Sequence, residues 1–404
     1  MLFAWILIGF AALSVAYPYV LYPLSLVILA RLRGRRSPAP ATEWEWPPIS
    51  ITIPVYNEAG QIDDLLDSIL RLDYPADRLQ VLVVSDASDD GTDERVQAYA
   101  DRGIELLRMP TRGGKTAGEN AARALLRGDI IVNTDASIRI DPAALMPLIS
   151  RFEDPSIGLA SGRDVSVTRV GGKLNVGELN VGESTYVGYE MWVRSLETDL
   201  SGIVGASGCF YAIRRELHQE TVPSAMSRDF AAALVTREHG YRAVTVNEAV
   251  CYVPRVPSLR REYRRKVRTI TRGMETLHYK RSLLNPFRFG AFSWMLFSHK
   301  ISRWFAPWAV VLGVVGLVAL AVTEPLAWAG VAGAAVIGGL GLIGWNWSEG
   351  RAIPRVFSMP AFLIAGNVAV LHATIKALTG ELNAVWEPTR RDAPTDHAPV
   401  LVDR

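Results

Sequence analysis

The chain has 404 residues, of which 49% are hydrophobic, and its mean hydropathy is +0.15. This value is high for a wholly water-soluble protein, and the apolar excess lies at the two ends rather than throughout. The net charge of +2 predicts no global electrostatic steering of a partner. Two cysteines, Cys209 and Cys251, are too few for a disulfide framework and have no clustered His or Asp partners for a metal site.

The first apolar run, Leu2–Leu32, is almost uncharged and long enough to span a bilayer with some tilt. The cations at its end are Arg31, Arg33, Arg35 and Arg36. Because cations flank the cytoplasmic end of a span, we expect this side in the cytoplasm and the amino terminus outside. A signal peptide would carry its charges before the apolar stretch, so residues 1–36 are predicted to be an N-terminal transmembrane anchor.

Between the apolar ends, residues 37–286 alternate strand and helix patterns. The strand patterns are Ile49–Pro54, Leu79–Val84, Ile104–Arg108 and Ile130–Asn133. The helix patterns are Glu58–Arg71, Asp90–Asp101 and Thr116–Arg127. This alternation predicts an α/β domain whose sheet is mostly parallel, with helices on both faces. Ligands of such sheets bind beyond the carboxyl ends of the strands.

Acidic side chains follow two of these strands. Asp86 comes after the second strand and Asp135 after the fourth. A carboxylate at a strand end can accept hydrogen bonds from a base edge or a ribose, although Asp86–Thr92 is equally typical of a helix cap. Asp135 with Ser137 offers hard oxygen ligands for Mg²⁺ or Mn²⁺, or forms only a turn.

A glycine-containing stretch, Arg112–Lys115, precedes the helix pattern at Thr116. Two glycines let backbone amides approach a phosphate, and the lysine adds a positive charge. The spacing differs from that of a Walker A loop, which disfavours a nucleotide triphosphatase.

Later segments add further polar candidates. Gly205–Phe210 is a small-residue loop that either lines an acceptor groove or makes a tight turn. Asp229 precedes a helical stretch and is either a general base or a helix N-terminal charge. Arg265 and Arg268 share a helix face that suits a diphosphate leaving group or anionic lipid headgroups. Because this basic cluster adjoins a membrane segment and lacks aromatic stacking residues, no nucleic acid is expected.

The carboxy-terminal part holds three more span-length apolar runs. They are Phe305–Thr323, Leu326–Trp347 and Phe357–Leu378. Phe289–Trp304 mixes aromatic and apolar residues with charges, which is typical of an amphipathic helix at the interface. We expect an interfacial helix at 287–304, about three spans within 305–380, and a polar tail at 381–404.

The side of the carboxy terminus stays open. Three spans after a cytoplasmic domain leave it outside, yet Arg390 and Arg391 favour the inside. Either the last segment is re-entrant or interfacial, or the number of spans differs. In each case a multi-pass protein of the cell (inner) membrane is predicted.

The order of these segments resembles that of the processive-type family 2 glycosyltransferases, membrane relatives of cellulose, chitin, hyaluronan and poly-N-acetylglucosamine synthases. The resemblance runs from Ile51 through the stretch 386–390. It implies a GT-A fold that binds a nucleotide-sugar, usually UDP-linked, together with Mg²⁺ or Mn²⁺. The implied role is synthesis of a cell-surface or extracellular polysaccharide.

The resemblance also implies roles for single residues. The residues near the nucleotide-sugar would be Pro54, Tyr56, Glu58, Asp86, Lys115, Asp135, Arg265 and Arg268. Asp135 would also hold the metal, and Asp229 would deprotonate the acceptor hydroxyl. The acceptor side would include Gly205, Ser207 and Gly208.

Three positions depart from the family pattern. Ser137 stands where the second Asp of the Asp-x-Asp motif is usual, and metal would then have fewer protein ligands. Arg265 replaces the Gln of the Gln-x-x-Arg-Trp motif, and Thr269 replaces its Trp. Since that Trp is associated with the acceptor end of the channel, transfer of one or a few sugars is as consistent with the sequence as long-chain synthesis.

The predicted reaction is a single in-line displacement with inversion at the anomeric carbon, from a nucleotide-sugar to a saccharide acceptor. Two alternatives remain: transfer to a polyprenyl-phosphate lipid, and an inactive nucleotide-sugar-binding subunit of an export complex. The sequence identifies neither the sugar, the linkage and the acceptor nor a partner for export.

Overall fold

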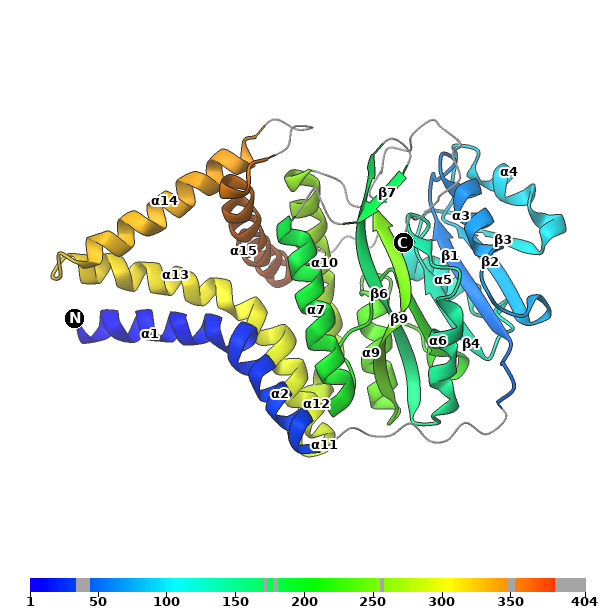
Figure 1. The fold of residues 1–404 in the computed structure, drawn as a ribbon, viewed down its shortest axis with the longest axis horizontal. Coiled ribbons are helices and arrows are strands. Elements are labelled where there is room, and N and C mark those ends of the chain that lie inside the picture. The colour runs from blue at the N-terminus through cyan, green and yellow to red at the C-terminus, as the bar shows by residue number, and fades with distance from the viewer. Residues whose placement is uncertain (34–43, 171–172, 177–180, 255–257, 348–352, 382–404) are drawn as a thin grey trace.

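The computed structural model describes residues 1–33, 44–170, 173–176, 181–254, 258–347 and 353–381. Figure 1 shows an α/β domain with a group of long helices projecting from one side, and the amino terminus at the far end of those helices. The expected polar tail at 381–404 lies outside the described residues beyond Glu381, as does the family stretch at 386–390.

The sheet is mixed, and its amino-terminal half is parallel as predicted. Its strand order is β3-β2-β1-β4-β8-β6-β9-β5, with β7 paired to β6. The parallel strands are β1 (Ile49–Val55), β2 (Leu79–Ser85), β3 (Ile104–Arg108) and β4 (Ile130–Thr134). The others are β5 (Arg139–Ile140), β6 (Ile157–Val170), β7 (Lys173–Val176), β8 (Phe210–Arg214) and β9 (Arg242–Pro254). β8 runs antiparallel to both β4 and β6, whereas β6 and β9 are parallel.

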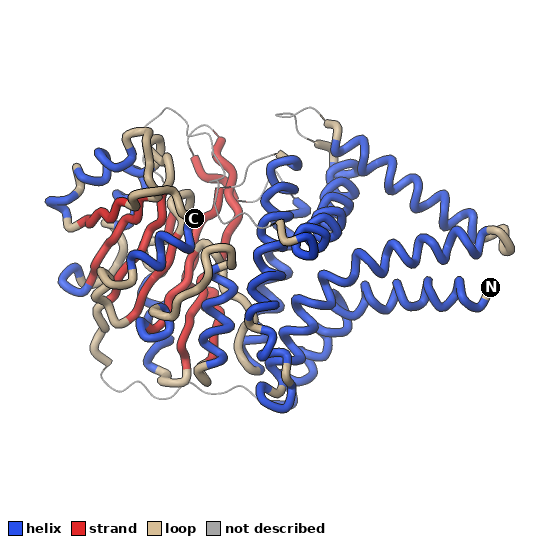
Figure 2. The backbone as a smooth tube through the Cα atoms, turned by 180° about the vertical axis from the view of Figure 1, so that it is seen from behind, coloured by secondary structure: helices blue, strands red, loops and turns tan. Residues whose placement is uncertain are grey.

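Helices cover both faces of this sheet, as Figure 2 shows from behind. They are α3 (Ile62–Ile69), α4 (Thr92–Gln97), α5 (Lys115–Ala122), α6 (Leu145–Ile149), α8 (Arg215–His218) and α9 (Arg228–Glu238). The apolar residues of each face form a core of their own. One core centres on Ile51, Leu65 and Ile149, and the other on Leu82, Ala122 and Val235. Because β1 is buried along its whole length, its end is held firmly in place.

The chain holds four helical segments long and apolar enough to cross a membrane. They are Leu2–Leu32, Ala291–Ala321, Ala327–Trp345 and Arg355–Thr379. The first consists of α1 (Leu2–Ala16), a π-helical turn (Tyr17–Leu21) and α2 (Tyr22–Arg33). The later ones include α12 (Ala291–Leu296), a π-helical turn (Phe297–Ile301), α13 (Ser302–Ala321), α14 (Ala327–Trp345) and α15 (Arg355–Thr379).

The segment expected to be a separate interfacial helix, 287–304, has a different form. It begins in the short helix α11 (Pro286–Phe289), and then Ala291–Ala321 continues as one helical segment. Phe292, Met295 and Leu296 are buried in a cluster with Tyr22 of the first segment. Part of the apolar surface of 287–304 therefore packs on protein, whereas Phe287 and Phe297 are exposed. The alternation of apolar and charged residues alone did not reveal this packing.

Two long helices stand between the sheet and the membrane candidates (Figure 1). They are α7 (Val181–Leu200) and α10 (Leu259–Tyr279). α10 packs against α15, where the Tyr263 hydroxyl and Nδ1 of His372 lie 3.0 Å apart. The helix with the basic cluster thus touches the α/β domain on one side and a membrane candidate on the other.

Candidate active site

Asp86 lies at the end of β2 and holds the glycine loop in place. Its two carboxylate oxygens accept hydrogen bonds from the backbone amides of Gly113 and Gly114, at 2.7 and 2.8 Å. Its own amide donates to the Val55 carbonyl at the end of β1. The two glycine amides that the sequence suggested for a phosphate are thus engaged by Asp86 in this structure.

Three residues expected near the nucleotide surround the end of β1. Pro54 is buried within the strand, and the Tyr56 ring lies 3.9 Å beneath the guanidinium of Arg112. Glu58 is buried and accepts a hydrogen bond from Gln61, while its backbone amide donates to Thr92 Oγ1. Asp86 and these residues form one edge at the carboxyl ends of β1 and β2.

Lys115 is the first residue of α5, and its side chain bridges a residue that follows β4 and a residue that precedes β8. Its Nζ donates to Asp135 Oδ1 at 2.5 Å and to the Gly208 carbonyl at 3.0 Å. Burial alone would lower the pKa of Lys115, but the carboxylates of Asp135 and Glu119 outweigh it and raise this pKa above its usual range. Lys115 is therefore a fixed positive charge in the site.

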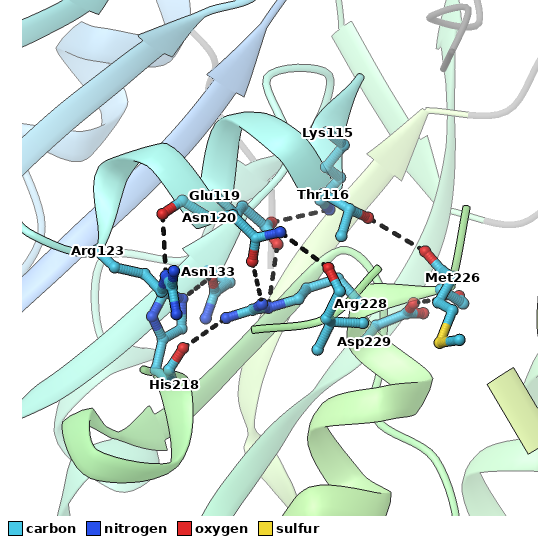
Figure 3. A network of polar contacts seen from close by, with 12 residues as sticks. Lys115, Thr116, Glu119, Asn120, Arg123, Asn133, His218, Met226, Arg228 and Asp229 are labelled. Atoms are coloured by element: carbon cyan, nitrogen blue, oxygen red, sulfur yellow. Dashed lines mark hydrogen bonds and ion pairs between the residues drawn. The ribbon is translucent and has the colours of Figure 1, made fainter. Parts of the chain in front are cut away.

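A buried polar network behind Lys115 was missed by the sequence analysis (Figure 3). Glu119 is fully buried between Lys115 Nζ at 4.0 Å and Arg228 Nε at 3.6 Å. Arg228 also donates to Asn120 at 2.8 Å and to the His218 carbonyl at 2.6 Å. Burial raises the pKa of Glu119 against the opposing effect of the two cations. The network ties α5 to the start of α9.

Asp229 lies in the first turn of α9, next to Arg228. Its Oδ1 accepts a hydrogen bond from Ser227 Oγ at 2.6 Å. Its other side faces Gly208, where a Cβ atom would come within 2.9 Å of Oδ2. Gly208 therefore leaves the space that the Asp229 carboxylate occupies. Asp229 is half-buried and lines two separate cavities.

The first of these, the strand-end cavity, has a volume of about 320 Å³. Its polar lining includes Glu58, Lys115, Asp135, Asp229, Arg265 and Arg268. Arg265 is held by Glu262, whose two oxygens accept from its Nε and Nη2 at 2.7 Å. The structure thus brings Glu58, Lys115, Asp135, Arg265 and Arg268 to one cavity, as the sequence analysis expected of a single site.

The second, the membrane-side cavity, has a volume of about 280 Å³. Its lining comes from the apolar ends of the chain as well as the α/β domain, and includes Tyr19, Glu190, Asp229, His299, Lys300 and Arg303. Thr269 of α10 lines both cavities. Asp229 and Thr269 therefore mark the border between them.

The residues expected on the acceptor side are split by the structure. Gly205 lines the membrane-side cavity, and Gly208 lines the strand-end cavity. Ser207 is buried: its hydroxyl donates to Asp164 at 2.6 Å and its amide to Ser161 at 2.8 Å. Asp164, which also lines the strand-end cavity, was not among the predicted residues. Its position depends on pairing between β6 and β9, which the sequence pattern did not specify.

A metal at this site would have few protein ligands. Among the described residues, no group of three or more His, Cys, Asp or Glu side chains could hold a metal ion. Asp135 is the carboxylate at the expected position, with Ser137 also on the cavity wall. Because Mg²⁺ often binds through one or two carboxylates together with substrate phosphates, this set fits a metal that arrives with a diphosphate.

A mixed, mostly parallel sheet with charged side chains at its strand ends defines a GT-A domain flanked by candidate membrane helices. Residues 50–221 match the family described as "Glycosyl transferase family 2". This match covers less than half of the chain, so this segment is similar to family 2 glycosyltransferases.

Several relatives match part of the chain. An N-acetylglucosaminyltransferase of Mesorhizobium japonicum is 34% identical over 122 residues, covering 29% of this chain and 28% of the relative. The beta-monoglucosyldiacylglycerol synthase of Synechocystis is 28% identical over 145 residues, covering 33% and 30%. The matches thus span about a third of the length of these relatives.

One solved structure is similar over nearly the whole chain. Mannosyltransferase PcManGT from Pyrobaculum calidifontis, in complex with GDP-Man and Mn²⁺, gives a TM-score of 0.71 at 24% identity. The alignment covers 94% of this chain and 99% of that one. The shared architecture therefore includes the helices on both sides of the GT-A domain.

Proposed function

We propose that the chain is an inverting glycosyltransferase that moves a sugar from a nucleotide-sugar to a saccharide acceptor at the membrane. The observation that carries this proposal is the position of Asp229 on the border of two cavities. On one side lie the cations that suit a diphosphate, and on the other lie residues of the candidate membrane helices. A base between donor and acceptor is what a single displacement requires.

In the proposed reaction, Asp229 accepts the proton of the acceptor hydroxyl, for which it needs to lie within hydrogen-bond range. The acceptor oxygen forms a bond to the anomeric carbon while the bond from that carbon to the diphosphate oxygen breaks. The electron pair leaves with the diphosphate, next to Lys115, Arg265 and Arg268. These cations stabilise the negative charge that grows in the transition state.

Asp135 would hold Mg²⁺ or Mn²⁺, which would supply further positive charge to the diphosphate when bound. The Mn²⁺ in the PcManGT structure supports a divalent metal in this fold. Lys115 Nζ engages one Asp135 oxygen, so it fixes the carboxylate at the cavity wall. The residues of this chain thus orient the donor even though Ser137 replaces the second acidic residue.

The donor is proposed to be UDP-linked on the strength of the family resemblance, and the GDP-Man bound to PcManGT makes a GDP-sugar the first alternative. The proposed setting is a multi-pass protein of the inner membrane with its GT-A domain in the cytoplasm, where nucleotide-sugars are present. The proposed product belongs to a cell-surface or extracellular polysaccharide, extended by one or a few sugars given Thr269.

The test uses purified protein in nanodiscs with Mg²⁺ or Mn²⁺ and a panel of UDP-, GDP- and dTDP-sugars. Release of free nucleotide from one donor, lost in Asp135→Ala and retained in the exposed-site control Asp101→Ala, is the expected result. Chelation of the metal should abolish the release and its return should restore it. Nucleotide binding without turnover of any donor, with or without added saccharides, would instead support an inactive binding subunit.

A further inference from the structure

Arg303 is a buried cation with unused hydrogen-bonding groups. It is 7% exposed, and its Nη1 donates to Glu190. Its Nε and Nη2 have no partner among the described residues. The guanidinium also lies over the rings of Tyr19 and Tyr189, 5.4 and 5.7 Å from their centres, which leaves the hydrogen-bonding capacity of these two buried nitrogens unused. The N–H groups of a guanidinium match the oxygens of a phosphate.

Lys300 adds a second positive charge on the same wall of the membrane-side cavity. Its Nζ lies 5.2 Å from the centre of the Phe230 ring and close to Gly205, where a Cβ would be 3.5 Å away. Within the part of the chain that the structure describes, Lys300 makes no ion pair or hydrogen bond. Gly205 therefore keeps the space beside this ammonium group open.

The acidic groups that face the cavity already have partners. Glu190 is bonded by Arg303 and lies 3.0 Å from His299 Nε2, and Asp229 accepts from Ser227. Glu197, behind His299, accepts from Tyr22 and lies 2.6 Å from His299 Nδ1. Each of these carboxylates has a partner on at least one oxygen, although Glu197 Oε2 has none among the described residues, whereas Lys300 and two groups of Arg303 remain for an anion.

Two π-helical turns, one in each of two candidate membrane segments, contribute residues to the wall of this cavity. Lys300 lies in the π-helical turn Phe297–Ile301, and Tyr19 on the facing wall lies in the π-helical turn Tyr17–Leu21. The turns are joined by Tyr17 and Ser298, whose hydroxyl oxygens are 2.7 Å apart. π-helical turns inside helices occur frequently at functional sites. Both turns belong to candidate membrane segments, so a ligand here would lie beside the bilayer.

We propose that Lys300 and Arg303 bind the phosphate group of a lipid-linked saccharide acceptor, so that the hydroxyl of its saccharide reaches Asp229. The inference rests on the proposed glycosyl transfer and names its acceptor class. A lipid-linked saccharide carries an apolar chain, a phosphate and a sugar in this order. The cavity wall brings together residues of candidate membrane helices, two cations and the Asp229 carboxylate.

The binding test uses octyl phosphate as the probe, titrated calorimetrically into protein in phosphatidylcholine nanodiscs. Lys300→Gln should weaken binding at least about tenfold, which corresponds to about 1.4 kcal/mol. Lys300→Arg should retain most of the affinity, since it keeps the charge. The matched control is Arg288→Gln, which removes an exposed cation from α11 outside the cavity and should bind like the wild type.

Equal binding of octyl phosphate by the wild type, Lys300→Gln and Arg303→Lys would overturn the proposal. Inorganic phosphate binding as tightly as octyl phosphate would overturn the lipid source and assign the site to free phosphate. A product in which the sugar is bonded directly to the lipid phosphate would also contradict it, because the phosphate would then lie at the reacting centre. Octanol is the neutral probe and should show no difference between the variants.

The same preparations distinguish failure of this inference from failure of the proposed function. In one outcome, the wild type releases nucleotide from a donor while Lys300→Gln leaves the affinity for octyl phosphate unchanged. In that case only the proposed phosphate site is wrong, and the proposed function stands. If no donor is turned over with a lipid-linked saccharide present, the proposed function fails together with its acceptor.

Discussion

The two cavities that meet at Asp229 are built in different ways. The strand-end cavity gathers side chains that follow β4 or lie on α5 and α10, close to positions predicted from the order of strands. The membrane-side cavity takes residues from Tyr19 to Val370, including both apolar ends of the chain. The strand-end cavity also takes Asp164 from β6 and Phe362 from α15, so both cavities depend on tertiary packing, but only the second draws on both apolar ends of the chain.

The cavities also differ in how far their polar groups are satisfied. On the strand-end side, Asp86 has both oxygens bonded and Lys115 is fixed by Asp135 and Gly208. On the membrane side, Arg303 keeps two nitrogens without a partner among the described residues. Arg272, on the wall of the strand-end cavity, has one such nitrogen, so the difference is one of degree. In the proposed reaction it fits a donor site held largely in advance beside an acceptor site that its ligand completes.

The largest effect is expected at the border between the cavities. Asp229→Asn keeps the shape of the side chain but removes the proton acceptor, so transfer should fall by at least about a hundredfold. Nucleotide binding should change little, because the asparagine side chain would occupy the same space. Initial rates of transfer and calorimetric titration with UDP measure the two quantities, with Asp101→Asn as the exposed control. Unchanged transfer would remove Asp229 from the role of base.

A smaller loss is expected from Asp86→Asn, because Asp86 holds the glycine loop that precedes Lys115. An asparagine has one acceptor oxygen, so one of the two amides at Gly113 and Gly114 would lose its partner, at about 1–3 kcal/mol. Part of this cost should appear as about tenfold weaker nucleotide binding, because the loop beside the site moves. Asp89→Asn, at an exposed carboxylate nearby, is the control. Equal affinity in both variants would show that the loop does not support the nucleotide.

Gly208→Ala tests the positioning of Asp229 without changing it. The new Cβ would meet Asp229 Oδ2 at 2.9 Å, and the end of this side chain can move without disturbing the fold. Transfer should fall about tenfold while Tm stays close to that of the wild type. Gly188→Ala, at an exposed helical site with no atom within 4 Å, is the control. A large loss of Tm with normal specific activity would contradict this assignment.

The smallest expected effect concerns stability and pH. Burial, followed by Arg228 and Arg123, holds the pKa of His218 well below its usual value. The folded state therefore favours neutral His218, and the stability it contributes is present above the unfolded pKa of about 6.5 and lost as pH falls below it. Tm should decrease between about pH 7 and pH 5.5 in the wild type, and less in His218→Gln. His278→Gln, at an exposed histidine, is the control and should show the same dependence of Tm on pH as the wild type. If Tm of His218→Gln falls with pH as steeply as that of the wild type, the effect comes from another group.

Sequence patterns predicted the parallel strands well and the helices less well. β3 matches its predicted range, and β1, β2 and β4 each extend one residue further. The helix expected from Asp90 begins at Thr92, because Gly91 has a φ of +90° and Asp90 accepts from the Thr92 amide. The helix expected from Glu58 begins at Ile62, since the Glu58 amide is bonded to Thr92 Oγ1. This last bond joins segments far apart in sequence.

The polar residues that support the site could not be found in the same way. Lys115 and Glu119 are spaced as a surface helix pair, yet Glu119 is buried and Lys115 half-buried, and Glu119 faces Arg228 from α9. Arg303 was expected to be an interfacial charge, but it is buried against Glu190 of α7. Helical periodicity shows which residues share a face and not which distant charge meets that face. A Lys-Glu spacing beside a predicted strand end was the one available signal.

The most direct test of two cavities meeting at one base is a kinetic comparison of Arg265→Gln with Lys300→Gln. Donor and lipid-linked saccharide acceptor are varied separately, and Arg288→Gln serves as the control for charge loss. If donor and acceptor occupy separate cavities, Arg265→Gln raises the KM for the donor at least about fivefold and leaves the KM for the acceptor unchanged. Lys300→Gln then raises the KM for the acceptor by a similar factor and leaves the KM for the donor unchanged. If either variant raises both KM values equally, donor and acceptor do not occupy separate cavities and the central claim is wrong.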